Sequence, residues 1–277
     1  MPPDPFELPV ERIRDGFYTD AYFNNSKRIL EREDRHPRVL MQVFQRHEAI
    51  LGGIDEALAV LRSCAGHRAD DGSWVSGWDE LEVRALAEGD EIAPQETVMT
   101  IEGDLSLFVH LETVYLGCLA RGTRLRTNVQ RVVEAAAGKA VLFFPARHDH
   151  YTVQPADGHM AYLALSAGVS TPAQAARFGG HEIGTLPHAL IAAYGGDTVA
   201  AAEAFVHGCN PSANITVLVD FENDSVRTAL EVAGRLGENL WGVRLDTAGS
   251  LIDRALADEP GPEEERRGVT PELVQRV

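Results

Sequence analysis

Four short stretches in the second half of the sequence end in side chains that could do chemistry. Each of these polar clusters follows an apolar run that is typical of a β-strand. The clusters are residues 144–147, 184–188, 220–224 and 244–246. In a parallel α/β barrel the loops after the strands open on one face, so clusters far apart in sequence converge on one site. That site would hold arginines, aspartates, a histidine and an aromatic ring. Such a mixture suits a ligand with anionic, hydroxylated and planar parts.

The elements that would position these clusters alternate between strand and helix. The strand candidates are residues 140–144, 181–184, 215–219 and 240–245, with a fifth near 168–169. The helix candidates are residues 172–178, 187–206, 224–236, 250–257 and 271–277. This alternation predicts βα units with right-handed crossovers. A closed barrel needs more strands than these, so we expect a barrel that is incomplete at its C-terminal end.

The first part of the chain has a different pattern and predicts a separate α+β domain. Residues 38–51 and 54–65 show helical apolar spacing, and residues 81–102 have the pattern of short strands joined by turns. Residues 105–137 contain few helix breakers, which predicts two consecutive helices. We therefore expect an N-terminal α+β domain at 1–105, followed by an irregular TIM-like α/β barrel domain at 106–277.

Composition excludes several classes of partner. Among 277 residues, 25 are Lys or Arg and 42 are Asp or Glu, and the net charge of -17 disfavours binding to nucleic acid. Cys64, Cys118 and Cys209 form no CxxC pair, so neither a zinc site nor a disulfide framework is indicated. The N-terminus has no signal-peptide pattern, and no run approaches the ~18 apolar residues of a membrane span. We expect a cytoplasmic protein with no membrane partner.

Six segments resemble nicotinate phosphoribosyltransferases and occur in the same order as in that family. They are Tyr18-Thr19-Asp20-Ala21-Tyr22, the stretch from Ala87-Glu88-Gly89-Asp90 to Ile101-Glu102-Gly103, Leu111-Glu112-Thr113, Phe144-Pro145-Ala146-Arg147, Gly184-Thr185-Leu186-Pro187-His188 and Val243-Arg244-Leu245-Asp246. The resemblance covers the chain from about residue 15 and implies the two-domain fold above. It also implies a homodimer with a shared site that makes nicotinate mononucleotide and pyrophosphate from nicotinate and phosphoribosyl pyrophosphate. Related nicotinamide and quinolinate enzymes share the fold.

The chemistry of that reaction suits the residues. Displacement of pyrophosphate from the anomeric carbon has oxocarbenium character, so it requires a clamp for the leaving group and accurate placement of a ring nitrogen. Phe144 and Arg147 match the family positions that stack on the pyridine ring and hold its carboxylate. Tyr22 matches an aromatic residue supplied by the second subunit. The residues alone favour a core position for Phe144, a surface ion pair for Arg147, and a packed interface or core position for Tyr22.

The acidic candidates lie after the last two strands. Arg244 and Asp246 resemble the family's Arg-x-Asp that contacts ribose and phosphates, where an aspartate can also help to hold Mg²⁺. A buried Arg-Asp ion pair is the alternative. The family's second aspartate is replaced here by residues 247–250, and the metal ligands stay unassigned. Asp220 begins a segment like the family's acidic loop, while Asp224 could bind ligand or cap the next helix.

His188 resembles the histidine that many family members phosphorylate with ATP to drive synthesis. Ser170 lies where the family has a residue facing the substrate, although Ser170 and Thr171 before Pro172 also have the pattern of a helix cap. Arg126 and Arg131 could contact phosphate or be ordinary helix-surface residues.

Between Arg244 and Val277 we find no Gly-rich phosphate loop of the kind that the family carries on later strands. Two hypotheses follow. One is an enzyme of nicotinate mononucleotide synthesis, and the other is a catalytically incomplete homologue that binds a pyridine nucleotide or a protein partner.

Overall fold

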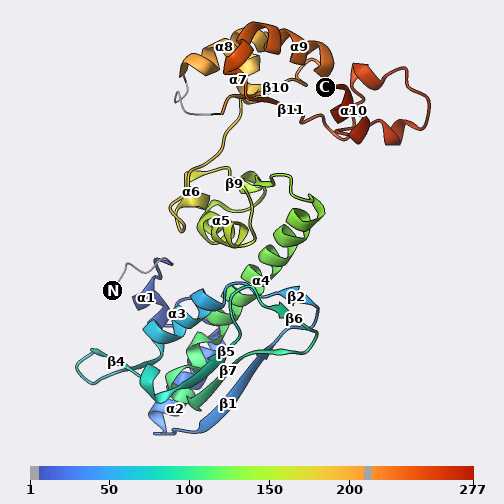
Figure 1. Ribbon diagram of the computed structural model, residues 1–277. Helices are drawn as coiled ribbons and strands as arrows, with labels where there is room; N and C mark the ends of the chain where they lie inside the picture. The colour runs from blue at the N-terminus through green and yellow to red at the C-terminus, as the bar shows by residue number, and fades with distance from the viewer. Residues whose placement is uncertain (1–5, 209–213) are drawn as a thin grey trace. The chain divides into compact units, whose positions relative to one another are not determined.

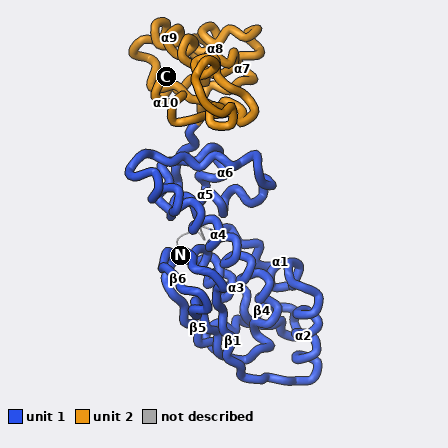
Figure 2. The backbone as a smooth tube through the Cα atoms, turned by 90° about the vertical axis from the view of Figure 1, so that its right-hand side faces the viewer, with its two compact units in different colours: residues 1–183 blue, residues 184–277 orange. Residues whose placement is uncertain are grey.

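The computed structural model describes residues 6–208 and 214–277 of the chain. The chain divides into two compact units, residues 1–183 and 184–277 (Figure 2). Within the described ranges, no helix combines the length and apolar character that crossing a membrane requires. The mixed α/β prediction is confirmed, while the predicted domain boundary near residue 105 stays a prediction. Cys209 lies outside the described residues.

Unit 1 begins with helices and an antiparallel sheet (Figure 1). Its helices are α1 (Val10–Arg14), α2 (Ala21–Arg32), α3 (Ile54–Cys64), α4 (Glu112–Ala135), α5 (Gln154–Leu163) and α6 (Pro172–Ala175). Its strands are β1 (Arg38–Phe44), β2 (Ala49–Ile50), β3 (Gly66–Arg68), β4 (Trp74–Ser76), β5 (Glu82–Ala85), β6 (Glu91–Ile92), β7 (Thr97–Asp104), β8 (Leu142–Phe143) and β9 (Gly168–Val169). Strands β1, β7 and β5, in that order, form the largest sheet, and both strand pairings in it are antiparallel.

The helix predicted over residues 38–51 is wrong, because β1 occupies its first half. Val39, Met41 and Val43 are half-buried and alternate with exposed residues, which is the two-residue period of a strand. The apolar residues of this short segment match a helical and a strand period almost equally well. Pairing with β7 decides between them, and a partner strand cannot be identified from the segment alone.

The main core of unit 1 lies between α3, α4 and the inner face of the sheet. Fully buried Leu61, Ile101 and Leu111 belong to it. The helix predicted at 54–65 is confirmed by α3. Residues 105–137 form two 3-10 turns and then one helix of 24 residues, α4, rather than the two helices predicted.

Glycines allow α3 and α4 to approach closely. A Cβ added to Gly52 would lie 2.5 Å from the Gly122 carbonyl oxygen, and Gly53 has a φ of +82°. The carboxylate of Glu88 then accepts hydrogen bonds from the backbone N–H groups of Gly53 and Ile54, at 3.1 and 3.0 Å. These bonds satisfy donors that a helix N-terminus otherwise leaves unpaired. The start of α3 is therefore fixed against α4 by shape and by charge.

A second core in unit 1 surrounds a parallel strand pair. β8 pairs with β9, and an isolated parallel bridge joins Val169 to Glu182. Phe143, Ala161 and Val169 are buried there. The predicted strands at 140–144 and 168–169 are confirmed, whereas the one at 181–184 is reduced to this single bridge.

Unit 2 consists of a short parallel sheet with helices packed on it. Its elements are α7 (His188–Ala193), α8 (Thr198–Gly208), β10 (Thr216–Leu218), α9 (Ser225–Leu236), β11 (Gly242–Arg244) and α10 (Pro271–Arg276). β10 and β11 pair in parallel, and an isolated parallel bridge joins Leu186 to Val217. Val217, Val219 and Val232 are buried between the strands and the helices.

Two helix predictions in unit 2 need correction. The helix predicted at 187–206 is divided into α7 and α8, because Gly195 and Gly196 have φ values of +69° and +94° that interrupt a right-handed helix. The helix predicted at 250–257 is wrong. A bridge between Ile252 and Arg267 and a 3-10 turn at Arg254–Leu256 stand there instead. The helices predicted at 224–236 and 271–277 are confirmed by α9 and α10.

We predict that Asp253→Ala destabilises the protein by roughly 2 kcal/mol or more, because it leaves buried donors unpaired. The fully buried carboxylate of Asp253 accepts hydrogen bonds from the Ser225 N–H, the Ser225 hydroxyl and the Ala255 N–H, at 3.0, 2.6 and 2.9 Å. Urea unfolding measures the change. The matched control is Asp258→Ala at an exposed position, and equal effects of the two substitutions would contradict the prediction.

We also predict a pH-dependent contribution from His36. Hydrogen bonds to Asp104, at 2.7 Å, and to Asp34, at 3.2 Å, raise the pKa of His36 above its usual value. A raised folded-state pKa gives stability that is fully present below the unfolded pKa of ~6.5 and is lost as pH rises through the folded pKa. The stability advantage of the native protein over His36→Gln should therefore shrink between about pH 6 and pH 8. Thermal melts of both proteins across this pH range measure the difference in stability. A difference that stays constant with pH would contradict the prediction.

Candidate active site

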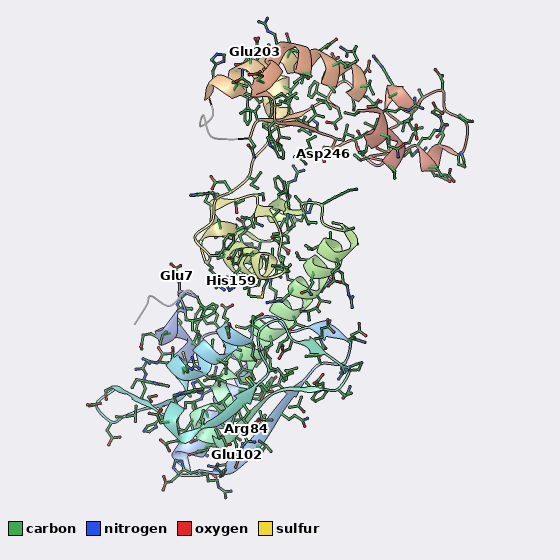
Figure 3. The ribbon with its side chains drawn as sticks, in the orientation of Figure 1. Glu7, Arg84, Glu102, His159, Glu203 and Asp246 are labelled. Carbon is green, nitrogen blue, oxygen red and sulfur yellow. The ribbon has the colours of Figure 1, made fainter. Side chains whose placement is uncertain are left out.

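In unit 2, polar side chains gather at one edge of the parallel sheet. Leu186, Val217 and Val243 are neighbours across the three strand segments. Because these segments run parallel, the residues that follow them lie at the same edge. His188, Asp220 and Asp246 come two or three residues after those neighbours, and Figure 3 labels Asp246 just beyond β11.

The first pair at this edge is His188 with Asp220. His188 is the first residue of α7, and Asp220 directly follows the buried Val219. The Nε2 atom of His188 lies 3.1 Å from Asp220 Oδ1. The Asp220 side chain is 4% exposed and the His188 side chain 40% exposed. A carboxylate can only accept, so in this pair Nε2 carries the proton and Nδ1 of the neutral ring keeps its lone pair. The Phe221 ring lies 6.2 Å from the imidazole, centroid to centroid.

The second group is centred on Arg244, the last residue of β11. Its Nη1 donates to the Thr185 hydroxyl at 3.2 Å, and its Nη2 lies 3.2 Å from Asp246 Oδ2. The ion pair that was the alternative prediction is therefore present, but it is not buried, because the two side chains are 33% and 36% exposed. The guanidinium is thus oriented from two sides while it stays accessible to solvent. Thr185 was missed as an individual candidate, although it lies in the motif that carries His188.

The other strand-end candidates lie in unit 1. Phe144 follows β8 and is half-buried, while Arg147 is exposed on a 3-10 turn after it. Ser170 follows β9, and its N–H and hydroxyl both donate to Gln174 Oε1 at 3.0 Å. Thr171 accepts a hydrogen bond from the Gln174 N–H at 3.1 Å, so the cap predicted for the next helix is confirmed. Of Phe144, Arg147 and Ser170, only Arg147 has a side chain that is largely in solvent.

Tyr22 lies on α2 and is 61% exposed, so it is not a core residue. Its hydroxyl donates to Asp20 Oδ2 at 3.3 Å. The same carboxylate oxygen accepts from the Thr113 hydroxyl at 2.8 Å, and the Asp20 N–H donates back to that hydroxyl at 3.1 Å. These bonds fasten the start of α2 to the start of α4. They hold an exposed phenol in a fixed position.

Two further expectations are corrected. Arg126 is not a surface residue, because it pairs with Glu88 at 3.3 Å and each side chain is 11% exposed. Asp224 makes no capping bond to α9. Its carboxylate instead accepts from Arg227, at 3.0 Å, while Asp253 accepts from the first N–H of the helix.

The structure therefore brings four predicted residues together in unit 2, namely His188, Asp220, Arg244 and Asp246. Tyr22, Phe144, Arg147 and Ser170 lie in unit 1. Convergence of all eight on one site stays a prediction. Across residues 6–208 and 214–277, no three His, Cys, Asp or Glu side chains form a group that could hold a metal ion by themselves.

Several known proteins are similar to this chain. Residues 20–123 match the family model of the quinolinate phosphoribosyl transferase N-terminal domain. Nicotinate phosphoribosyltransferase pncB1 of Mycobacterium tuberculosis is 31% identical over 173 residues, which cover 60% of this chain and 38% of that protein. Its pncB2 counterpart is 31% identical over 190 residues, covering 66% and 41%. The chain thus spans less than half the length of these two relatives.

Solved structures show the same fold. The nicotinate-nucleotide pyrophosphorylase of Pyrococcus furiosus has a TM-score of 0.76 and 32% identity, over 90% of this chain and 61% of that one. Human nicotinic acid phosphoribosyltransferase has a TM-score of 0.61 over 84% of this chain and 61% of that one, and at 20% identity it supports the fold alone.

The fold and the matched segments are similar to those of phosphoribosyltransferases. Within this class, the similarity is to nicotinate and quinolinate phosphoribosyltransferases, in sequence over residues 20–123 for the family model and in fold over 90% of this chain for the Pyrococcus furiosus structure.

Proposed function

We propose that this protein transfers a phosphoribosyl group from phosphoribosyl pyrophosphate to the ring nitrogen of nicotinate, releasing pyrophosphate. The observation that supports this most is Arg244, held between Thr185 and Asp246 beside the His188–Asp220 pair. An oriented guanidinium at parallel strand ends suits phosphate and ribose oxygens. The similarity to nicotinate and quinolinate phosphoribosyltransferases suggests the reaction type.

In this proposal Arg244 and Asp246 act on the phosphoribosyl group. The guanidinium stabilises negative charge on phosphate oxygens, and the partly exposed carboxylate accepts hydrogen bonds from ribose hydroxyls. Because Thr185 and Asp246 already fix the guanidinium, less conformational entropy is lost when substrate binds. The ring nitrogen then forms its bond to the anomeric carbon as the bond to pyrophosphate breaks.

Mg²⁺ fits these residues as an ion carried largely by the substrate. Magnesium in such sites is bound by one or two carboxylates together with substrate phosphates, and it keeps several waters. Asp220 and Asp246 are the carboxylates at this edge of the sheet, and a larger protein cage is absent from the residues that the structure describes. When bound, the ion would neutralise charge on the leaving pyrophosphate.

We assign nicotinate to Phe144 and Arg147. A half-buried aromatic ring offers a face for the flat pyridine, and an exposed arginine three residues later offers a partner for its carboxylate. Tyr22 would complete the site from the second subunit of a homodimer, since its exposed phenol is held in place by Asp20. We further propose that the parallel pairs β8–β9 and β10–β11 belong to one irregular TIM-like barrel.

ATP coupling is assigned to His188. With Nε2 held by Asp220, the Nδ1 lone pair is the nucleophile available to attack the γ-phosphorus of ATP. A bond forms between Nδ1 and phosphorus, the bond from phosphorus to the bridging oxygen breaks, and ADP leaves. The hydrogen bond to Asp220 holds the proton on Nε2, and the Asp220 carboxylate stabilises the positive charge that develops on the imidazole ring.

Quinolinate is the second candidate substrate, because the family model that matches residues 20–123 is that of quinolinate enzymes. Assays of the purified protein with nicotinate, nicotinamide and quinolinate separate the candidates. Product formation from nicotinate at the highest kcat/KM supports the proposal. A preference for either other ring contradicts the nicotinate assignment, and a protein that binds pyridine nucleotide but turns over none of the three is the incomplete homologue.

Arg147→Ala should weaken nicotinate binding by about 10- to 100-fold, because it removes a charge-assisted contact worth roughly 1.5–3 kcal/mol. Binding of phosphoribosyl pyrophosphate should change by less than about twofold, since that ligand is assigned to other residues. Calorimetric titration with each ligand measures both. Arg46→Ala, at another exposed arginine, is the control. Equal losses for the two ligands would show that Arg147 does not hold the carboxylate.

His188→Ala should abolish the stimulation of synthesis by ATP and leave slower, uncoupled synthesis, because ring placement depends on other residues. His207→Ala, at an exposed histidine of α8, should keep the stimulation. Initial rates with and without ATP measure the effect, and phosphorus NMR of the labelled protein should show the phosphoryl group on Nδ1. Unchanged stimulation in His188→Ala would make this histidine structural.

A further inference from the structure

Unit 1 contains a cavity of about 380 Å³ that none of the residues assigned a catalytic or substrate role above lines. It lies between the segment leading into α1 and helices α3, α4 and α5. Ile13, Val60 and Met160 contribute buried apolar walls. A volume of this order is at the small end of the range that ligand pockets occupy.

The charged groups of the wall already neutralise each other. Both carboxylate oxygens of Asp157 accept from Arg121 at 2.8 Å. Both oxygens of Glu56 accept from Arg177, at 2.9 and 3.0 Å. A charged ligand would have to compete with these bidentate pairs and lose its own hydration. The wall is therefore complementary to an uncharged ligand.

The state of Cys118 agrees with an apolar interior. Its thiol lines the cavity, and burial raises the pKa of Cys118 to about 12, so that it is a neutral thiol at physiological pH. A neutral thiol is a small apolar group with a weak S–H donor.

Gly117 borders the cavity on α4, at an exposed position of the helix. Outside the helix's own backbone and the neighbours in the chain, no described atom lies within 4 Å of a Cβ added to Gly117. Gly122, five residues later in α4, differs, because an added Cβ would lie 2.7 Å from Gly52 backbone atoms. A larger side chain at residue 117 therefore has open space to occupy.

We propose that this cavity, lined by Ile13, Val60, Gly117, Cys118 and Met160, binds an uncharged and largely apolar small molecule. The occupant packs against the α4 backbone at Gly117. The closed ion pairs Arg121–Asp157 and Glu56–Arg177 exclude anionic competitors, among them substrates that carry phosphate. This binding site does not depend on the proposed reaction, so a result that contradicts one of the two proposals does not contradict the other.

The test uses N-phenyl-1-naphthylamine, an uncharged probe whose fluorescence increases in apolar surroundings, with the full protein. The native protein should show saturable binding to one site per chain. Gly117→Leu should weaken that binding at least tenfold, because leucine fills the space. Gly234→Leu is the matched control, since Gly234 in α9 also has nothing within 4 Å of an added Cβ but lies outside the cavity. It should bind the probe as the native protein does.

Three outcomes would overturn the proposal: no saturable binding to the native protein, equal binding to Gly117→Leu, or a change of oligomeric state in Gly117→Leu on light scattering. The last result would assign this face to contact between copies of the chain. If Gly117→Leu fails to fold, alkylation of Cys118 by N-phenylmaleimide in the native protein decides. Saturating probe should slow that alkylation at least fivefold, measured by mass spectrometry of the Cys118 peptide, and an unchanged rate also overturns the proposal.

Discussion

Parallel pairing of β10 with β11 is the constraint on which the candidate active site depends. The register Val217 to Val243 and Leu218 to Arg244 places Asp220 and Asp246 at the same edge, and the bridge from Leu186 to Val217 adds the segment that carries His188. Antiparallel pairing would put the ends of neighbouring strands at opposite edges. Val217, Leu218 and Val219 are consecutive buried residues, so both faces of this segment are packed, as is usual for a parallel strand.

The sequence predicted the elements whose signal is local. The strands of unit 2 are apolar runs bounded by polar residues, and α9 begins after an acidic loop, so both are recognisable without a partner. Structure that depends on a distant partner was missed or misassigned. β1 is a strand only because β7 pairs with it. The helix α2, which contains no fully buried residue, was not predicted although its apolar residues lie on one face.

The same distinction applies to individual residues of the site. His188, Asp220, Arg244 and Asp246 could be proposed because their types and motifs are recognisable at strand ends. Thr185 gains its role only through the hydrogen bond to Arg244, which comes from another strand. Asp253 replaces Asp224 at the start of α9 for the same reason, since no local rule connects residues 28 positions apart.

Net charge sets a further requirement on the site. The proposed substrate carries several negative charges and approaches a protein of net charge -17. Screening limits the range of this repulsion to roughly 8 Å at physiological ionic strength, so local groups decide the binding energy. Arg126 and Arg177 serve structure, since each pairs with a largely buried glutamate. Arg244 differs because a neutral hydroxyl and a partly exposed carboxylate are among the groups that orient it. A hydroxyl fixes the direction of the guanidinium without cancelling its charge, and that is the property an anion site needs in an acidic protein.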